Sequence, residues 1–234
     1  MKKPIIELRR VWKTYKMGEQ EVHALQGINL EVFPGEFLAI QGPSGSGKST
    51  AMNLIGCLDM PTKGEIYLER QNISRLSESD LARIRGKRIG FMFQKFNLIE
   101  TLTALENVML PMTFQGIPAD ARVERATRLL ARFGLGERIH HKPNQLSGGE
   151  QQRVAIARAL TVDPYVILAD EPTGNLDSRA GREVMLFLRE LNEHEGKTIV
   201  LVTHDDLLAR TADRIVFLKD GAITKTQITR GAKK

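Results

Sequence analysis

Short apolar runs alternate with helix-like stripes along most of the chain, and this alternation predicts the class of fold. Runs with the length of a buried strand occupy residues 36–40, 64–68, 89–93, 165–169 and 198–202. Between the last two runs, apolar residues such as Val184, Leu188 and Leu191 recur at the spacing of an amphipathic helix. Strands that alternate with helices are typical of an α/β protein with a mostly parallel sheet.

The two ends of the chain show a different pattern. Residues 4–40 read as short strands separated by turns at residues 16–18 and 34–35. Near the C-terminus, two apolar runs flank Asp220-Gly221, which is a typical hairpin turn. We therefore expect antiparallel pairing at the C-terminal end in addition to the parallel sheet.

A helical segment interrupts the strand pattern in the middle of the chain. From about residue 97 to residue 160 the apolar spacing is helical, with breaks at Pro118 and Gly134. The chain has 234 residues, 41% of them hydrophobic, which is enough for one large domain or for a core with an inserted lobe. We expect an inserted helical lobe.

Charge and cysteine content narrow the possible partners and location. The net charge is +6, but acidic residues are spread throughout and no long basic block occurs, so we interpret the charge as a solvated surface and expect no nucleic-acid partner. The single cysteine, Cys57, lies among apolar residues and is expected to be buried. No apolar run approaches the roughly 18 residues that cross a bilayer. We expect a cytoplasmic protein whose membrane role would come through a partner.

Residues 42–50 fit the phosphate-binding pattern G-x-x-x-x-G-K-[S/T] between a predicted strand and a predicted helix. Glycines let successive N–H groups point at phosphate oxygens, Lys48 adds a positive charge, and Ser49 offers a hydroxyl to Mg²⁺. This loop predicts binding of ATP or GTP with Mg²⁺. Its expected contacts are Ser44, Gly45, Ser46, Gly47, Lys48, Ser49 and Thr50.

Polar residues follow three other predicted strands. Asp170 and Glu171 come directly after the run 165–169, where Asp170 would hold Mg²⁺ through water and Glu171 would polarise the attacking water. His204 follows the run 198–202 and could reach the γ-phosphate, although a strand-end histidine is more often structural. Gln94 could bring its side-chain oxygen to Mg²⁺ or water, and by itself would be unremarkable. A solvated acidic turn is the alternative for Asp170 and Glu171.

Residues 146–150, Leu-Ser-Gly-Gly-Glu, precede a helix rich in alanine and valine. Ser147 is a good helix N-cap, and the amide groups behind it would form an anion site. A simple helix cap explains the same residues, and spacing alone leaves both interpretations open.

Taken in order, these motifs resemble one family. The phosphate loop, Gln94, the Leu-Ser-Gly-Gly-Glu motif, the strand with Asp170-Glu171, and His204 are similar to those of the nucleotide-binding subunit of an ABC transporter. The resemblance implies an α/β fold, a P-loop NTPase core of the RecA type with an antiparallel β-subdomain and a helical subdomain. It places the core at about residues 1–95 and 161–234, and the helical subdomain at about 96–160.

The resemblance also implies how the residues act. Two subunits would form an ATP-dependent head-to-tail homodimer with two ATP molecules between them. Ser147, Gly148 and Gly149 would contact the nucleotide held by the other subunit, and Asp177 would lie in the loop that links the two sites. Tyr15 matches the aromatic residue that stacks on adenine, although a core tyrosine is a fair alternative. Lys48, Glu171 and His204 would carry catalysis.

Within the family, the sequence most resembles the lipoprotein-releasing and macrolide-exporter branch, through segments such as 56–59 and 103–108. The expected partner is an integral membrane permease, with export or extrusion of a lipophilic or peptide-like substrate. The alternatives are coupling to an uptake permease or to a cell-division-type signalling complex, a soluble nucleic-acid-associated ATPase, and a scaffold that barely hydrolyses nucleotide. Glu150 departs from the glutamine most common in the family motif.

Overall fold

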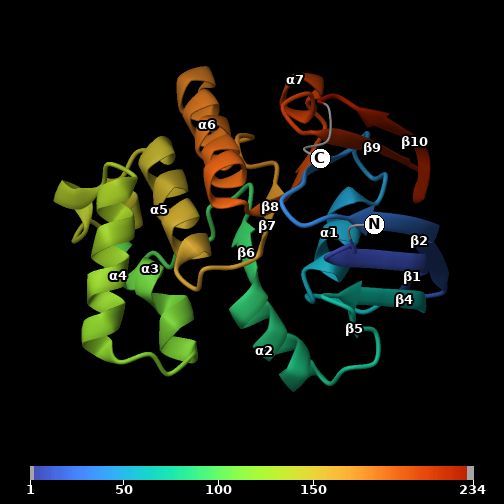
Figure 1. Cartoon of the computed structure of the whole chain (residues 1–234), viewed down its shortest axis with the longest axis horizontal. Coiled ribbons are helices and arrows are strands. Elements are labelled where there is room, and N and C mark those ends of the chain that lie inside the picture. The colour runs from blue at the N-terminus through green and yellow to red at the C-terminus, as the bar shows by residue number, and fades with distance from the viewer. Residues whose placement is uncertain (1–2, 231–234) are drawn as a thin grey trace. The chain divides into compact units, whose positions relative to one another are not determined.

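The structure of the chain is a computed structural model that describes residues 3–230 (Figure 1). The chain divides into two compact units. The first consists of Met1–Arg85 with Glu190–Lys234, and the second of Gly86–Arg189. Both contain strands and helices, in agreement with the expected α/β class.

An antiparallel sheet begins the first unit. Its strands are β1 (Ile6–Met17), β2 (Gln20–Val32), β4 (Lys63–Leu68) and β5 (Gln71–Asn72), in the order β2-β1-β4-β5. The prediction of short strands was wrong for β1 and β2, which have 12 and 13 residues. Register shifts between β1 and β2 break the simple alternation of apolar and polar residues without ending the strands.

The first unit also contains four strands in the order β10-β9-β3-β8. The central strand β3 (Phe37–Gln41) pairs in parallel with β8 (Thr198–Thr203) and β9 (Arg214–Lys219), and β9 pairs antiparallel with β10 (Ala222–Ile228). Every residue of β3 and β8 is buried. The strands predicted at 36–40 and 198–202 and the C-terminal hairpin are confirmed.

Helix α1 (Lys48–Ile55) follows the phosphate loop, and the short α7 (Asp206–Ala209) follows β8. The helix predicted after the phosphate loop is confirmed, and it ends at Ile55 because Gly56 caps it and Cys57 adopts a left-handed backbone with φ 55°. Cys57 is buried, as expected, and burial raises the pKa of its thiol to about 11. The thiol is therefore protonated at neutral pH.

The second unit joins two parallel strands to a group of helices. β6 (Ile89–Met92) pairs in parallel with β7 (Val166–Asp170). The helices α3 (Ala104–Phe114), α4 (Ala119–Arg132) and α5 (Gly148–Leu160) pack against one another, and Figure 1 shows them as neighbours. They confirm the predicted helical segment, and α4 lies between the predicted breaks at Pro118 and Gly134.

The remaining elements are short or cross between the units along the chain. The 3₁₀ turns Gly136–Arg138 and Pro143–Gln145 connect α4 to α5. Helix α6 (Ser178–Glu195) contains the apolar stripe seen in the sequence. Helix α2 (Glu78–Arg88) was not predicted, because only Leu81 of its side chains is buried and no apolar stripe marks it.

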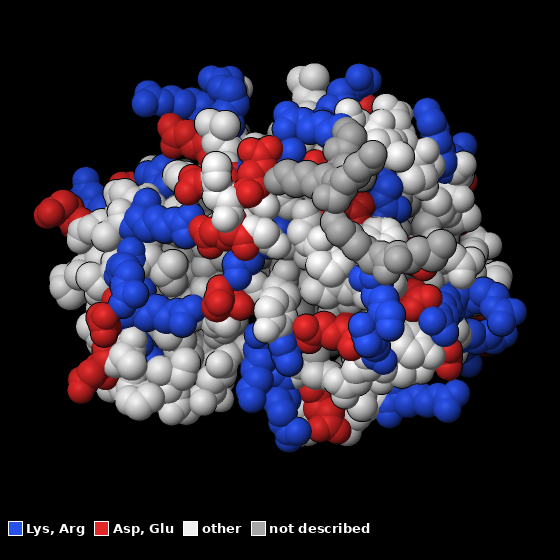
Figure 2. Space-filling model, in the orientation of Figure 1, with Lys and Arg blue, Asp and Glu red and all other residues white. Residues whose placement is uncertain are grey.

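The surface carries both signs of charge. Figure 2 shows lysine and arginine side chains interspersed with aspartate and glutamate over the face in view, which agrees with the interpretation of the net charge as a solvated surface. Within residues 3–230, none of the helices has the length and apolar character needed to cross a bilayer.

Candidate active site

The phosphate loop of the first unit connects β3 to α1. Gly47 caps the helix in a left-handed conformation with φ 99°, and a Cβ there would lie 2.3 Å from the carbonyl oxygen of Ala24. Only glycine fits this position. The first helical hydrogen bond runs from the Ala51 N–H to the Gly47 carbonyl, and no side chain caps the helix. The amides before Ala51 therefore face the loop, as an anion site requires.

Two side chains inside this loop fit a phosphate ligand. Lys48 is 7% exposed, and its ammonium group donates to the carbonyls of Gly42 and Pro43 at 2.9 and 2.8 Å. Ser46 is 2% exposed, and its buried hydroxyl has no hydrogen-bond partner within the described residues. An unsatisfied buried hydroxyl is costly, and an oxygen-rich ligand in the loop would satisfy it.

His204 lies near the same end of the parallel strands. Gln41, the last residue of β3, is in register with Thr203, the last residue of β8. The phosphate loop follows Gln41 and His204 follows Thr203, so both leave the sheet at the carboxyl edge, where α/β proteins bind ligands. His204 is exposed, and Asp205 after it caps α7 through its carboxylate.

Tyr15 belongs to a polar cluster on the first unit. Its hydroxyl donates to Asp59 at 2.8 Å, and Lys13 contacts both that carboxylate and the face of the Tyr15 ring. Burial opposes ionisation of Asp59, but hydrogen bonds from Lys13, Tyr15 and the Met60 N–H outweigh it and lower its pKa. Sequence reasoning missed Asp59, because its side-chain partners Lys13 and Tyr15 lie more than forty positions away along the chain.

The second unit places Gln94, Asp170 and Glu171 at the carboxyl ends of its two parallel strands. Met92 at the end of β6 is in register with Ala169, so Gln94 and the two carboxylates follow neighbouring strands. Glu171 has a left-handed backbone with φ 43°, a conformation that costs energy in a residue other than glycine and often marks a functional site. Asn175 donates to the Gln94 carbonyl at 2.8 Å. Sequence reasoning gave no role to Asn175.

The motif at residues 146–150 forms a complete capping box at the start of α5. The Ser147 hydroxyl accepts from the Glu150 N–H at 3.3 Å, and the Glu150 carboxylate accepts from the Ser147 N–H and hydroxyl at 2.8 and 2.9 Å. The predicted N-cap is confirmed. The hydrogen bonds that the Glu150 carboxylate accepts, chiefly the one from the Ser147 N–H, lower its pKa. A carboxylate therefore shares the helix N-terminus with any bound anion.

A surface pocket of about 410 Å³ brings this motif together with the start of α6. Ser147, Gly148 and Gly149 line one side and Asp177 lines the other. Asp177 also caps α6, accepting from the N–H groups of Arg179 and Ala180. Arg153, which forms an ion pair with Glu183 at 3.3 Å, adds a positive charge that sequence reasoning missed. Its position four residues after Gly149, on the same helix face, was the available signal.

The loop after Gln94 is fastened by side chains from two helices. Arg158 of α5 donates to the carbonyls of Phe96 and Asn97 at 2.8 and 2.5 Å. Burial lowers the pKa of Arg158. Asn107 of α3 is fully buried; it accepts from the Ile99 N–H and donates to the carbonyls of Ile99, Leu102 and Thr103. Residues 96–103 therefore have little freedom to move relative to α3 and α5.

The family follows from comparison with known proteins. The sequence profile of the family described as "ABC transporter" matches residues 25–174. The chain belongs to this family. It is an ATPase of the ATP-binding cassette type with a P-loop NTPase fold, as the sequence predicted.

Relatives match nearly the whole chain. An uncharacterized ABC transporter ATP-binding protein of Methanocaldococcus jannaschii, MJ0796, is 53% identical over 231 residues, which are 97% of this chain and 98% of that protein. The macrolide export ATP-binding/permease protein MacB of Wolinella succinogenes is 52% identical over 227 residues, covering 97% of this chain and 35% of MacB. A dimeric post-hydrolysis structure of the MJ0796 cassette, bound to ADP and Pi, has a TM-score of 0.90 and 51% identity, covering 97% of this chain and 99% of that one.

Proposed function

We propose that two copies of this ABC ATPase form a head-to-tail dimer and hydrolyse ATP between them. The observation that carries the proposal is the pocket at Ser147, which opens at the N-terminus of α5 and is separate in sequence from the phosphate loop. In this proposal, the Ser147 pocket of one subunit contacts the phosphates of the nucleotide held by the phosphate loop of the other subunit. The dimeric MJ0796 structure with ADP and Pi supports this arrangement.

In this proposal the phosphate loop holds the nucleotide and the strand-end residues carry the chemistry. Lys48 leaves its loop carbonyls for the outer phosphates, and residues Ser44 to Thr50 surround them. Glu171 orients and polarises the attacking water, and His204 contacts the γ-phosphate or that water. The left-handed backbone at Glu171 fixes the direction in which its side chain leaves β7.

Mg²⁺ fits the donor set of the chain. Ser49, Gln94 and Asp170 offer a hydroxyl, an amide oxygen and a carboxylate, which are the oxygen ligands this ion prefers, directly or through water. When bound, the ion would neutralise phosphate charge. No cluster of three or more His, Cys, Asp or Glu side chains suited to a metal occurs within the described part of the chain.

The remaining nucleotide contacts come from Tyr15 and from the partner copy's signature pocket. Ser147 and Gly149, supported by Gly148, would contact the γ-phosphate bound to the other subunit. Asp177 would connect the two sites through the segment that also lines this pocket. Tyr15 would stack on adenine with the exposed part of its ring, while Asp59 and Lys13 hold its position.

We propose that ATP hydrolysis drives a membrane permease, which the ATPase contacts at the cytoplasmic face of the membrane. MacB, whose name combines an ATP-binding and a permease function, is about three times as long as the region that this chain matches, and it supports a permease as the driven component. The identity to MacB favours export or extrusion of a lipophilic or peptide-like substrate. Coupling to an uptake permease or to a cell-division-type complex is the second candidate.

Substituting Glu171→Gln tests the proposed chemistry. The variant should lose ATP turnover while forming an ATP-bound dimer that gel filtration separates from the monomer, because the substitution removes the base and retains the nucleotide contacts. Glu124→Gln, an exposed substitution on α4, should keep wild-type turnover. Wild-type turnover in Glu171→Gln would exclude Glu171 as the base.

The permease partner is tested by purifying the tagged Glu171→Gln protein from detergent-solubilised membranes with ATP present. Enrichment of a permease with few spans and a large external domain is the result expected for export. Enrichment of a permease that travels with a solute-binding protein would replace export by uptake. Tight, salt-sensitive binding to nucleic acid instead of a membrane protein would contradict the permease proposal.

A further inference from the structure

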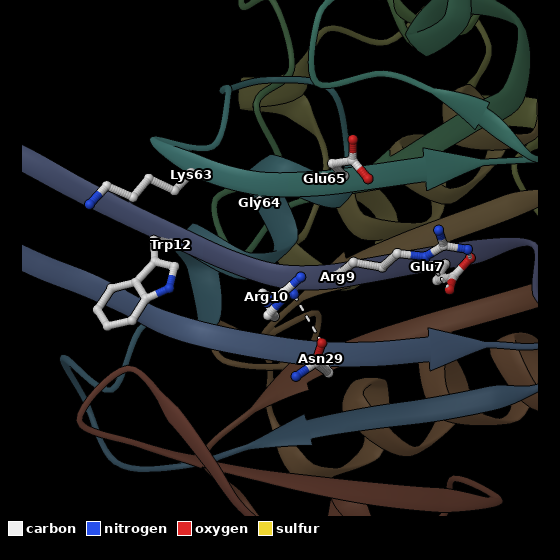
Figure 3. Close-up of a pocket in the computed structure, with 8 residues that line it drawn as sticks. All are labelled: Glu7, Arg9, Arg10, Trp12, Asn29, Lys63, Gly64 and Glu65. Carbon is white, nitrogen blue, oxygen red and sulfur yellow. Dashed lines mark hydrogen bonds and ion pairs between the residues drawn. The ribbon is translucent and has the colours of Figure 1, made fainter.

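A hollow of about 720 Å³ on the antiparallel sheet is built around a β-bulge (Figure 3). Between Leu8 and Val11, β1 contains one more residue than the facing stretch of β2. The same excess occurs against β4, between Arg9 and Trp12. Arg10 is the extra residue, with a left-handed backbone at φ 46°. A bulge of this kind redirects side chains on the surface of a sheet.

Neighbouring strands carry residues that fit this bulge. The Arg10 N–H, displaced from the strand ladder, donates to the Asn29 side chain of β2 at 2.9 Å. On β4, a Cβ at position 64 would lie 2.3 Å from the Arg10 carbonyl oxygen, so Gly64 is required there. A left-handed arginine is strained. Asn29 on β2 and Gly64 on β4 therefore accommodate this strained geometry from the two sides of β1.

The bulge brings two cations and an aromatic ring to one surface. Arg9 and Arg10 are consecutive and both exposed, whereas a regular strand would turn one of them inward. The Trp12 ring lies against Gly27, where a Cβ would contact it at 3.0 Å, and the residue remains 38% exposed. Lys63 is the register partner of Trp12 on β4. Figure 3 shows Trp12 and Lys63 at one end of the hollow and Arg10 toward its middle, next to Asn29.

Two cations of the hollow have no ion-pair partner within the described residues. Glu7 pairs with Arg9 at 2.6 Å, and Glu65 accepts from the Tyr67 hydroxyl at 2.9 Å. Neither Arg10 nor Lys63 forms an ion pair with a carboxylate inside residues 3–230. The hollow therefore contains two cations that can pair with an external carboxylate, together with an exposed indole.

A second hollow of about 390 Å³ continues the first. Both are lined by Glu7 and Arg9, and the second adds Tyr67 and Arg70. The guanidinium group of Arg9 lies over the Tyr67 ring at 4.6 Å, between the two hollows. We call the combined surface the basic groove. Its charged lining residues are five cations (Lys3, Arg9, Arg10, Lys63 and Arg70) and three carboxylates (Glu7, Glu31 and Glu65), and Trp12 and Tyr67 add two rings.

We propose that the basic groove binds an extended acidic segment of a partner protein, with an apolar side chain of that segment against Trp12. Arg10, Lys63 and Arg70 match carboxylates spaced along a chain, whereas a compact anion would use only one end of the groove. Single-stranded nucleic acid fits less well. A peptide can place uncharged residues opposite Glu7, Glu31 and Glu65, whereas every nucleotide carries a phosphate that these carboxylates would repel. Arg9 also covers the Tyr67 ring already, which leaves few free faces for base stacking.

The test uses a panel of short fluorescein-labelled peptides of glutamate and serine that differ in the position of one phenylalanine. Fluorescence anisotropy at low ionic strength should show saturable binding by at least one member and none by its glutamine counterpart. Arg10→Glu with Lys63→Glu should weaken binding by about tenfold or more, and Trp12→Ala should also weaken it. The control double variant Lys87→Glu with Arg125→Glu makes the same charge change at exposed positions outside the groove and should retain binding.

A further variant separates binding from folding. Arg10→Gly removes the cation and relieves the left-handed strain, so it should lose peptide affinity while its thermal unfolding midpoint stays equal or rises. The proposal is overturned if no peptide binds saturably, if the control double variant weakens binding as much as the groove variant, or if Trp12→Ala has no effect. Tighter binding of a single-stranded oligonucleotide that the groove substitutions abolish would also overturn it, in favour of nucleic acid. ATP turnover is a separate readout, so failure here leaves the proposed function untouched.

Discussion

Asn107 offers a quantitative test of how the loop after Gln94 is held. The side chain is fully buried, and its two amide hydrogens are shared among three carbonyl oxygens while its oxygen accepts from the Ile99 N–H. Replacement by alanine removes the partners of the Ile99 N–H and the Leu102 carbonyl, at a cost of roughly 1–3 kcal/mol for each unmet group that water cannot reach, whereas the carbonyls of Ile99 and Thr103 keep the backbone N–H groups of Leu102 and Asn107. Because the loop can relax and admit water, we expect a loss of about 3 kcal/mol in the free energy of unfolding.

Urea unfolding followed by circular dichroism measures this loss, which corresponds to a fall of about 6–12 °C in the unfolding midpoint for a chain of this length. Asn107→Asp should be worse than Asn107→Ala at neutral pH, because a carboxylate faces three carbonyl oxygens. Its folded-state pKa would be raised, so the deficit should shrink as pH falls and the group is protonated. Asn144→Ala, at an exposed position, is the control. A loss below about 0.5 kcal/mol for Asn107→Ala would refute the reasoning.

Two further predictions concern charged groups near the proposed nucleotide contacts. The pKa of Asp59 is lowered in the fold, so its ionised form stabilises the protein above the ordinary carboxyl pKa of about 4. This contribution disappears as pH falls through the folded pKa. Asp59→Asn should therefore destabilise the protein at pH 7 and cost less in acid, which thermal unfolding across a pH series measures. Glu150→Gln keeps an acceptor for the Ser147 N–H while removing a negative charge from the α5 N-terminus. ATP-dependent dimerisation, measured by light scattering, should therefore strengthen severalfold at low salt and less at high salt. Weaker dimerisation would contradict repulsion between the Glu150 carboxylate and the phosphates.

Strand positions were predictable from the sequence because burial on both faces leaves continuous apolar runs. β3, β7 and β8 are nearly or fully buried, and the polar residues that follow such runs fall at the carboxyl ends of strands. The placement of His204 after β8 and of Asp170 at the end of β7 needed no tertiary information. The phosphate loop was likewise recognisable, because its glycine spacing is demanded by local backbone geometry.

Features that depend on contacts distant in sequence were not predictable. The length of β1 depends on a bulge at Arg10 that requires Asn29 and Gly64 on other strands. The left-handed conformation of Glu171 could not be predicted from the sequence, because nothing in the residue type favours it. The sequence identified Ser147 as a cap, but whether Glu150 turns back to complete the box is a matter of rotamer and packing.

The two ends of α5 hold different parts of the second unit, and this has a mechanical consequence. Ser147 caps the helix at the surface pocket, while Arg158 near its other end donates to the backbone carbonyls of Phe96 and Asn97. The helix has 13 residues, so it forms a rod about 20 Å long. Because α5 is one continuous hydrogen-bonded element, a displacement of its first turn would move the loop after Gln94 with it, through the hydrogen bonds of Arg158.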